Sequence, residues 1–172
     1  MSTCVVLNGT SSSGKTTIAR AFQEAALPRV FLNFSIDSIL YALPPSAVTR
    51  ITAGADIADL RLPELVRAFY ACTKQLLDLG HDLIIDHAVT AQYHADLLQE
   101  ATGAHDVVLV GLDCPIEILR DRERLRADRR LGMAERQAKS IHTLLTYDVF
   151  IDTSTVAPEE AARRILGTLE ST

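Results

Sequence analysis

The order of apolar and polar positions divides the chain into short apolar runs separated by longer stretches with helical spacing. Five runs predict strands: CVVLN (4–8), VFLNFSI (30–36), DLIID (82–86), DVVLVGL (106–112) and YDVFID (147–152). Several are almost continuously apolar, which is typical of strands covered by helices on both faces. Helices are predicted at 15–26, 63–79, 91–101, 115–127, 134–146 and 158–170. This alternation favours a parallel sheet with crossover helices.

The stretch 63–79 carries the clearest helical pattern. Its apolar residues lie near one face at helical spacing, and Gly80 follows as a stop signal. These residues are Leu65, Val66, Phe69, Cys72, Leu76 and Leu77. Pro158 suits the first position of the last helix. The least regular piece is ALPPSAVTRITAGADIADLRLP (42–63), which we interpret as a loop-rich excursion.

The bulk composition is that of an ordinary folded domain. At 172 residues, 48% hydrophobic and 23% charged, the chain (1–172) is long enough for one domain with a substantial core. A net charge of −5 and a pI near 5.5 argue against a nucleic-acid binder that relies on bulk charge. No apolar run approaches the roughly 20 residues that span a bilayer, and no secretory signal is visible. Three scattered cysteines fit reduced thiols. We therefore expect a cytoplasmic domain without nucleic-acid or membrane partners, and the oligomeric state stays open.

Residues 8–17, NGTSSSGKTT, follow the first apolar run and precede a helical stretch. They meet the pattern G-x-x-x-x-G-K-[ST] through Gly9, Gly14, Lys15 and Thr16, and we name residues 9–16 the phosphate loop. Glycines allow left-handed turns that aim successive backbone N–H groups at an anion, at a helix N-terminus. The lysine of such a loop reaches the terminal phosphates, and the threonine hydroxyl ligates Mg²⁺. A chance match is the alternative, but strand and helix flank the loop as required, so we predict a nucleoside triphosphate site.

Asp86 ends the apolar run LIID. The carboxyl ends of parallel strands converge on the ligand crevice, so this carboxylate is placed to hold Mg²⁺ directly or through water. An aspartate that caps a turn is the alternative, and beside a phosphate loop we favour the Mg²⁺ role. For the neighbouring His87, a hydrogen-bonded structural role and a catalytic role both stay open.

Asp37 closes the run VFLNFSI and begins DSILYAL. One interpretation is that its carboxylate caps a helix. The other is that it lies across the crevice from the triphosphate and accepts the proton of a substrate hydroxyl. Kinases need such a positioned group because much of their catalysis is orientation and charge neutralisation. Spacing alone does not decide between the two.

Seven of the seventeen basic residues lie in LRDRERLRADRRLGMAER (119–136). Acidic residues interleave with them, so part of this segment is a solvated helix face with i,i+4 pairs. Four arginines nevertheless recur every three or four residues, which predicts a clamp on phosphoryl oxygens. They are Arg122, Arg126, Arg129 and Arg130, and we expect Arg126 and Arg129 to be the working pair. Gly132 would let the segment move as a lid over the nucleotide.

With these segments in view, the chain resembles the chloramphenicol phosphotransferase family of small P-loop kinases, which are related in fold to nucleoside monophosphate, shikimate and gluconate kinases. The similar segments are LNGTSSSGKTT, FSIDSIL, LIIDH, RERLRADRRLGMAERQ and YDVFIDTS, and they follow the family's order and spacing. The phosphate loop alone identifies only a superfamily. The segment around Asp37, RADRRLGMA (126–134) and YDVFIDTS are considerably more family-specific.

The resemblance implies ATP- and Mg²⁺-dependent transfer of the γ-phosphate to a hydroxyl of a small molecule. It suggests Asp37 as the general base, and phosphate contacts from Arg126, Arg129 and Lys15. In related kinases the segment that corresponds to Thr153, Ser154 and Thr155 lies near the adenine. We predict an α/β P-loop NTPase domain of three layers, α/β/α. Its five-stranded parallel sheet has the order 2-3-1-4-5, and an arginine-rich lid spans about 120–136.

The predicted site groups its residues by role. The catalytic residues are Asp37, Lys15, Arg126 and Arg129. The nucleotide-binding residues are Gly9, Thr10, Ser11, Ser12, Ser13, Gly14, Lys15, Thr16, Thr17 and Arg122. Thr16 and Asp86 are the predicted Mg²⁺ ligands, and ATP and Mg²⁺ are the expected cofactors.

Two features depart from the family pattern. Thr10 stands where a second glycine is expected, and residues 42–75 resemble the antibiotic kinase only weakly. The region of about 38–75 should line the acceptor pocket, through residues such as Tyr41, Leu43, Phe69 and Tyr70. It offers only four basic residues (Arg50, Arg61, Arg67 and Lys74), which mildly favours a small neutral hydroxyl-bearing acceptor. Chloramphenicol, with a role in antibiotic resistance, is the leading hypothesis. The alternatives are a metabolite kinase with a nucleotide, sugar or shikimate-like acceptor, and a nucleotide-dependent switch or toxin-like module.

Overall fold

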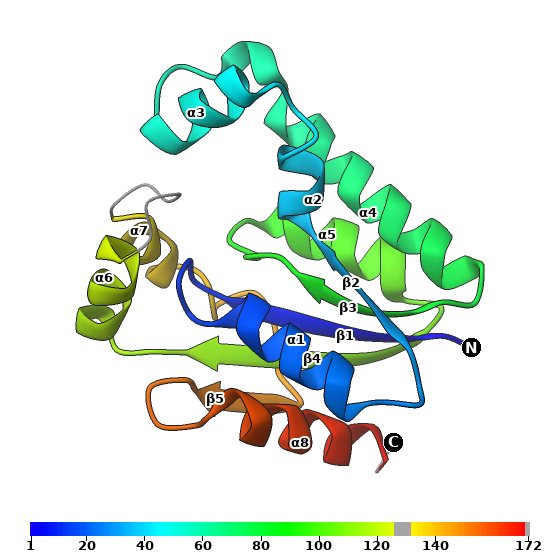
Figure 1. The fold of residues 1–172 in the computed structure, drawn as a ribbon. Helices are drawn as coiled ribbons and strands as arrows, with labels where there is room; N and C mark the ends of the chain where they lie inside the picture. The colour runs from blue at the N-terminus through cyan, green and yellow to red at the C-terminus, as the bar shows by residue number, and fades with distance from the viewer. Residues whose placement is uncertain (126–131, 171–172) are drawn as a thin grey trace.

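A five-stranded parallel sheet forms the centre of the computed structural model, which describes residues 1–125 and 132–170. Its order is β2-β3-β1-β4-β5, as predicted (Figure 1). The strands are β1 (Thr3–Gly9), β2 (Phe31–Ser35), β3 (Asp82–Asp86), β4 (Asp106–Asp113) and β5 (Val149–Asp152). All five apolar runs therefore form strands, with bounds that lie within two residues of the predicted ones.

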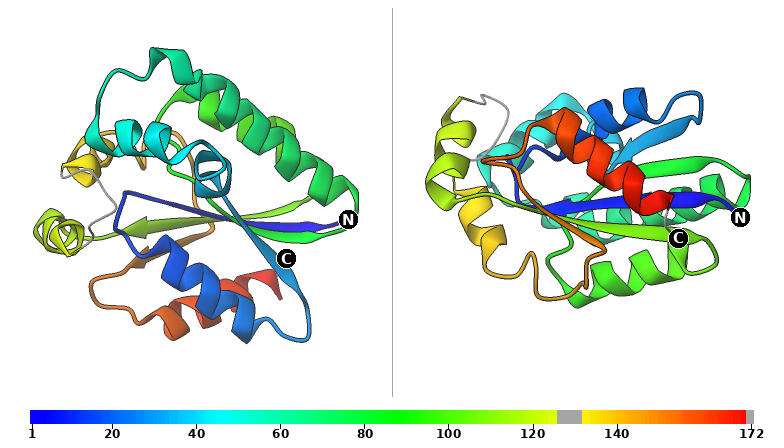
Figure 2. Two further views of the ribbon diagram at one scale, coloured as in Figure 1. Left: turned by 45° about the horizontal axis from the view of Figure 1, so that its top comes forward. Right: turned by 90° about the horizontal axis from the view of Figure 1, so that it is seen from below.

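Helices cover both faces of this sheet. On one face α1 (Lys15–Ala25) packs beside α8 (Pro158–Leu169), and on the other α4 (Leu62–Asp78) packs beside α5 (Gln92–Thr102) (Figures 1 and 2). This is the three-layer α/β/α arrangement of a P-loop domain. Helix α8 begins with Pro158, and α4 stops before Gly80, which has a positive φ of 92°. Both boundary signals act as predicted.

Each face of the sheet has its own apolar core. Val5 and Leu7 of β1 pack with α1 and α8 on one face, while Cys4 and Val6 pack with α4 and α5 on the other. Successive side chains of a strand point to opposite faces, so one continuous apolar run supplies both layers. The central position of β1 follows from this pattern.

The buried face of α4 agrees with the predicted one at Phe69 and Leu77, and Val66 and Leu76 pack against the same core, but Cys72 does not belong to it. Phe69, Tyr70, Thr73 and Leu77 are its buried residues, whereas Cys72 is exposed. The assignment of Cys72 to the apolar face is wrong, because the turn that carries Tyr70 and Thr73 faces the sheet instead. None of the helices described here is both long and apolar enough to cross a membrane.

The other helices are short, and Figure 1 shows α6 and α7 at the end of the sheet that lies away from the two chain termini. They are α2 (Ile36–Leu40), α3 (Pro45–Ala53), a 3-10 turn (Ala58–Leu60), α6 (Ile116–Arg124) and α7 (Met133–Ala138). The description of 42–63 as loop-rich is wrong for α3. This helix begins with Pro45 at its first position and ends before Gly54, which has φ 66°. It was missed because only Ala47 is buried, which leaves little apolar periodicity.

Helix α7 is shorter than the predicted helix at 134–146. It ends at Ala138, and turns follow. In these turns the Ser140 N–H donates to the Gln137 carbonyl, and the Thr143 N–H donates to the Ser140 carbonyl. The carbonyl of Ile141 accepts hydrogen bonds from two side chains, Asn8 and Tyr147. Because that carbonyl is occupied by tertiary partners, the helical bonding pattern does not continue through it.

Candidate active site

A cleft of about 940 Å³ lies at the carboxyl ends of the central strands. Its lining comes from the phosphate loop, from the start of α2, from the residues after β3, and from parts of α3, α4, α6 and α7. Parallel strands bring their carboxyl ends to the same edge of a sheet, so segments far apart in the sequence meet here. The predicted site residues Lys15, Thr16, Asp37 and Asp86 all line this cleft.

The phosphate loop depends on backbone conformations that few residues tolerate. Gly14, directly before α1, has φ 93°, and Ser12 is held at φ 63°. At Gly9 a Cβ atom would lie 2.6 Å from Ser13 Oγ and 2.7 Å from the carbonyl oxygen of Leu112. These contacts are shorter than real Cβ atoms make, so only glycine fits at this position.

Three consecutive hydroxyl groups in the loop lack partners. The Oγ atoms of Ser11, Ser12 and Ser13 are buried and make no hydrogen bond to any described residue. A buried polar group without a partner costs about 1–3 kcal/mol. Ser11 and Ser12 line the cleft, so a polar ligand bound there can supply partners to the loop. At the N-terminus of α1, where the helix dipole is positive, this ligand is best an anion. The loop therefore fits the phosphate groups of a nucleotide.

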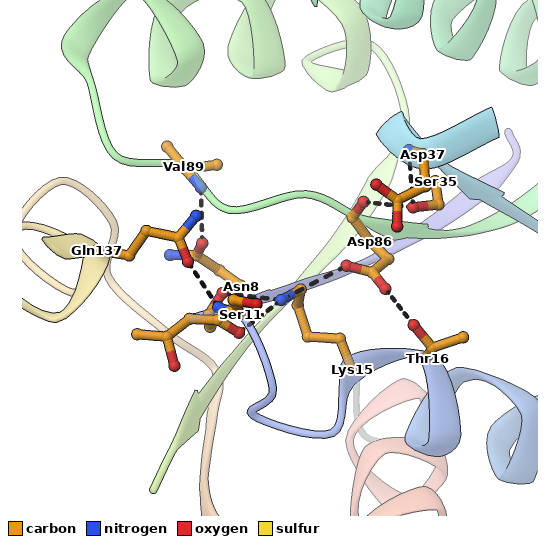
Figure 3. Close-up of polar contacts among 11 residues, drawn as sticks. Asn8, Ser11, Lys15, Thr16, Ser35, Asp37, Asp86, Val89 and Gln137 are labelled. Atoms are coloured by element: carbon orange, nitrogen blue, oxygen red, sulfur yellow. Dashed lines mark hydrogen bonds and ion pairs between the residues drawn. The ribbon is translucent and has the colours of Figure 1, made fainter. Parts of the chain in front are cut away.

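Lys15, Thr16 and Asp86 form one connected polar group (Figure 3). Thr16 Oγ1 donates to Asp86 Oδ2 at 3.0 Å, and Lys15 Nζ lies 3.7 Å from Asp86 Oδ1. Lys15 Nζ also donates to the carbonyl oxygens of Gly9 (2.9 Å) and Thr10 (2.8 Å). The predicted phosphate-binding cation and the two predicted Mg²⁺ ligands are thus brought together at the cleft.

The oxygen donors at this point fit a Mg²⁺ ion. Within residues 1–125 and 132–170, no group of three or more His, Cys, Asp or Glu side chains could enclose a metal. Mg²⁺ does not need such a cage, because it usually keeps one or two carboxylates together with phosphate oxygens and waters. The Thr16 hydroxyl and the nearly buried Asp86 carboxylate are donors of this kind.

Ser35, not Asp37, caps helix α2. Its Oγ accepts a hydrogen bond from the Asp37 N–H (3.2 Å) and donates to the backbone oxygen of Asp86 (3.2 Å). The capping interpretation of Asp37 is therefore wrong. Asp37 instead lies in the first turn of α2 and lines the cleft, and Figure 3 shows it close to Asp86.

Arg122 joins α6 to two segments of the nucleotide side. Its guanidinium donates to Thr153 Oγ1 (3.2 Å), to the Thr153 carbonyl (2.8 Å) and to the Ser12 carbonyl (3.4 Å). Thr153 lines the cleft, but Ser154 and Thr155 are not among its described lining residues. Arg126 and Arg129, the other predicted phosphate contacts, lie outside the described residues, as does Arg130.

Asn8 is a site residue that the sequence analysis missed. Its fully buried amide accepts from the Val89 N–H (2.9 Å) and donates to the Ile141 carbonyl (2.7 Å) and the Tyr147 hydroxyl (2.7 Å). One side chain next to the phosphate loop thereby holds together the segment that follows β3 and the segment that joins α7 to β5. The sequence feature that could have indicated this role is the polar residue at the end of the apolar run CVVLN.

Helix α7 also touches the phosphate loop. Gln137 Oε1 accepts a hydrogen bond from the Ser11 N–H at 2.6 Å (Figure 3). The start of α7 is held by Glu123 of α6, whose buried carboxylate accepts from the N–H groups of Gly132 (2.9 Å) and Ala134 (2.7 Å). Glu123 was overlooked because it belongs to the charged segment 119–136, part of which was interpreted as a solvated helix face, and Gln137 directly follows that segment.

The side of the cleft opposite the phosphate loop is mainly apolar, and we name it the acceptor wall. It consists of Ile36, Asp37, Leu40, Tyr41, Val48, Ile51, Thr52, Leu62 and Val66. Tyr41 was correctly predicted to line the cleft. Leu43 is absent from the described lining, and the assignment of Phe69 and Tyr70 is wrong because both are buried in the core.

His87 is hydrogen-bonded in the interior of the cleft wall. Its Nδ1 lies 2.8 Å from the Tyr70 hydroxyl, and its ring packs edge-on against Phe69. Burial is the main cause that lowers the pKa of His87 to about 3, with smaller effects from the charges of His94 and Lys15. The imidazole is therefore neutral at physiological pH.

Known proteins with the same architecture include several kinases. The chain is similar to a sugar kinase from Janibacter sp. HTCC2649, with a TM-score of 0.76 and 22% identity over 99% of this chain and 95% of that chain. It is also similar to the Mycobacterium tuberculosis APS kinase CysC in complex with AMPPNP and APS. That match has a TM-score of 0.68 and 18% identity over 98% of both chains. At these identities the matches show a shared fold.

The sequence comparisons identify the family as well as the fold. A Mycobacterium tuberculosis H37Rv protein named "Putative O-phosphotransferase" is 30% identical over 184 residues, which cover 94% of this chain and 79% of that protein. The family model described as chloramphenicol phosphotransferase-like protein matches residues 2–170. This confirms the resemblance inferred from the sequence: the chain is a phosphotransferase and belongs to the chloramphenicol phosphotransferase-like family.

Proposed function

We propose that the protein transfers the γ-phosphate of ATP to a hydroxyl group of a small neutral molecule. Family membership supports a small-molecule kinase, and the phosphate loop, with the unpartnered hydroxyls of Ser11 and Ser12 at the cleft, supports a nucleoside triphosphate as donor. The main evidence for a neutral acceptor is the composition of the acceptor wall. Among its described residues Asp37 alone bears a charge at neutral pH. Such a surface favours a neutral, partly apolar acceptor.

The basic residues of the acceptor region support the same conclusion. Recognition of a carboxylate or phosphate on an acceptor normally uses a guanidinium or ammonium group that reaches the cleft. None of the four basic side chains in residues 38–75 lines the cleft. Three of them pair with nearby carboxylates: Arg50 with Asp59, Arg61 with Glu64 and Lys74 with Asp78.

The arrangement supports transfer by positioning and charge neutralisation. Lys15 would hold the terminal phosphates against the phosphate loop, and Asp37 would accept the proton of the substrate hydroxyl. As that oxygen bonds to the γ-phosphorus, the bond from the γ-phosphorus to the bridging oxygen breaks and ADP leaves. Mg²⁺ held by Thr16 and Asp86 would neutralise phosphate charge when bound.

We propose chloramphenicol as the first acceptor to test, with phosphorylation at its 3-hydroxyl and a role in antibiotic resistance. The family name and the neutral acceptor wall support this choice. Because residues 42–75 resemble the antibiotic kinase only weakly, other neutral hydroxyl compounds belong in the same test.

The testing experiment is incubation of the purified protein with ATP·Mg²⁺ and a pool of neutral antibiotics, sugars, nucleosides and acidic metabolites. Mass spectrometry then reports any compound that gains one phosphate group, and the Asp37→Asn protein serves as the blank for contaminating kinases. We expect a neutral acceptor to be phosphorylated. Phosphorylation of acidic compounds alone would overturn the neutral class, and ATP binding without any transfer would favour a nucleotide-dependent switch.

A further inference from the structure

Two histidines, His87 and His94, lie side by side in the cleft wall and have no part in the phosphoryl transfer described above. Their ring centroids are 4.8 Å apart, and both side chains line the cleft that contains Lys15 and Asp37. His87 directly follows β3, and His94 lies in the first turn of α5. The hydrogen bonds behind the two rings indicate which nitrogen of each ring carries its proton.

For His94 the protonated nitrogen follows from a backbone contact. The Thr90 N–H donates to His94 Nδ1 at 3.3 Å. A backbone N–H can only donate, so Nδ1 must hold a lone pair and the ring proton must be on Nε2. No residue in the described part of the chain accepts a hydrogen bond from His94 Nε2.

For His87 the same result follows from the buried Tyr70 hydroxyl. This hydroxyl lies 2.8 Å from His87 Nδ1 and makes no other hydrogen bond within the described residues. If Nδ1 carried the proton, the phenolic O–H would be buried without an acceptor, at a cost of about 1–3 kcal/mol. Tyr70 therefore donates to Nδ1, and the ring proton of His87 is also on Nε2.

In both rings Nδ1 therefore accepts a hydrogen bond, from Tyr70 in His87 and from the Thr90 N–H in His94. The proton of each ring is on Nε2, at the opposite edge. No described residue occupies either Nε2–H group. Two neighbouring neutral donors suit an oxygen that carries lone pairs but no full charge. Neither histidine is then a cation, yet both can still donate hydrogen bonds.

We propose that the Nε2–H groups of His87 and His94 form a two-donor subsite for an acceptor-molecule oxygen, such as a carbonyl, nitro or second hydroxyl oxygen. By holding this oxygen, the subsite orients the reacting hydroxyl toward Asp37. Tyr70 is a positioning residue that fixes the orientation and tautomer of His87. This inference rests on the proposed function, because it concerns the acceptor of that same reaction.

The first test measures the protonated ring nitrogens in the free protein. Long-range ¹H–¹⁵N NMR of histidine-labelled protein at pH 7 should show both rings neutral with the proton on Nε2. The Tyr70→Phe variant should move His87 toward a mixture of tautomers and leave His94 unchanged. A proton on Nδ1 of either histidine in the wild-type protein would overturn the subsite, whatever the acceptor is.

The second test measures binding of chloramphenicol, by calorimetry, in the presence of a non-hydrolysable ATP analogue. A glutamine side chain places an amide near the position of ring Nε2, whereas asparagine reaches only the position of Nδ1. We expect His87→Asn and His94→Asn to weaken chloramphenicol binding about tenfold each, the effect of one lost hydrogen bond. His87→Gln should keep most of the affinity, and binding of the ATP analogue should not change.

The matched control is His81→Asn, an exposed histidine outside the cleft, which should leave both affinities unchanged. Equal chloramphenicol affinity in the wild-type, His87→Asn and His94→Asn proteins would overturn the subsite while the proposed function stands. Failure of the wild-type protein to bind or phosphorylate any neutral acceptor would instead overturn the proposed function and the subsite with it.

Discussion

The phosphate loop and the acceptor wall meet in one cleft but are assembled in different ways. The phosphate loop is one continuous segment, and its backbone is constrained by Gly9, Ser12 and Gly14. The acceptor wall collects side chains from α2, α3 and α4, which lie at different places in the chain. The first surface is defined mainly by backbone conformation, and the second by side-chain identity.

This difference shows how proteins with one fold can bind the same phosphate donor and different acceptor molecules. A backbone cradle binds the phosphate groups common to all nucleoside triphosphates, so few substitutions within it are tolerated. Apolar side chains on separate helices can be exchanged one at a time with modest cost to the core. Changes in the acceptor wall should therefore alter the acceptor and spare the nucleotide.

The largest expected effect concerns Asp37, which belongs to the acceptor wall yet acts in the chemistry. Asp37→Asn should lower kcat about 10²- to 10⁴-fold, the usual contribution of a general base, because the amide cannot take the proton. The affinity for ATP should stay within about twofold, because the phosphate loop is untouched. Asp96→Asn, an exposed carboxylate on α5, is the control. Near-normal turnover of Asp37→Asn would contradict the assignment of Asp37 as the general base.

The second prediction tests the backbone constraint. Gly9→Ala should destabilise the protein by roughly 1–3 kcal/mol, because its Cβ overlaps Ser13 and the Leu112 carbonyl. It should also weaken ATP binding. Gly167→Ala is the matched control, because a Cβ there meets no atom of the described residues within 4 Å and an alanine inside α8 is slightly stabilising. Denaturant unfolding and nucleotide titration measure both effects, and equal behaviour of the two variants would contradict the constraint.

The smallest effect should come from the apolar part of the acceptor wall. Ile51→Ser removes half-buried apolar area that faces the acceptor, and should raise the acceptor KM about three- to tenfold. The KM for ATP should not change. Ile51→Val, which keeps the wall apolar, should have an effect near the limit of detection. If the KM for ATP rises as much as the acceptor KM, the acceptor wall and the phosphate loop do not act independently.

The phosphate half of the site could be predicted because its information is local. The glycine spacing, the adjacent apolar strand and the following helix lie within residues 4–26, and the roles of Lys15 and Thr16 follow from position in the motif. Asp86 could be placed because parallel strands bring their carboxyl ends together. These inferences require only that the strands are parallel, which the alternation of apolar runs and helical stretches indicates.

The acceptor half could not be predicted in the same way because its contacts are tertiary. The sequence does not show that Ser35 caps α2 or that Asp37 lines the cleft. Periodicity alone did not reveal that Phe69 and Tyr70 face the core. The hydrogen bond between Tyr70 and His87 likewise joins residues that only the folded chain brings together.

The buried amide of Asn8 has a consequence for the order of folding. Its three hydrogen bonds join residues separated by 81, 133 and 139 positions. The bonds to Ile141 and Tyr147 span more of the chain than the pairing of β1 with β3 or β4, and closing a longer loop costs more chain entropy. These two bonds should therefore form after the local helices and after that pairing. During synthesis, Tyr147 must leave the ribosome before this junction is complete. The cleft should therefore be the last part of the molecule to mature, and a truncated chain would keep its phosphate-loop sequence without a working site.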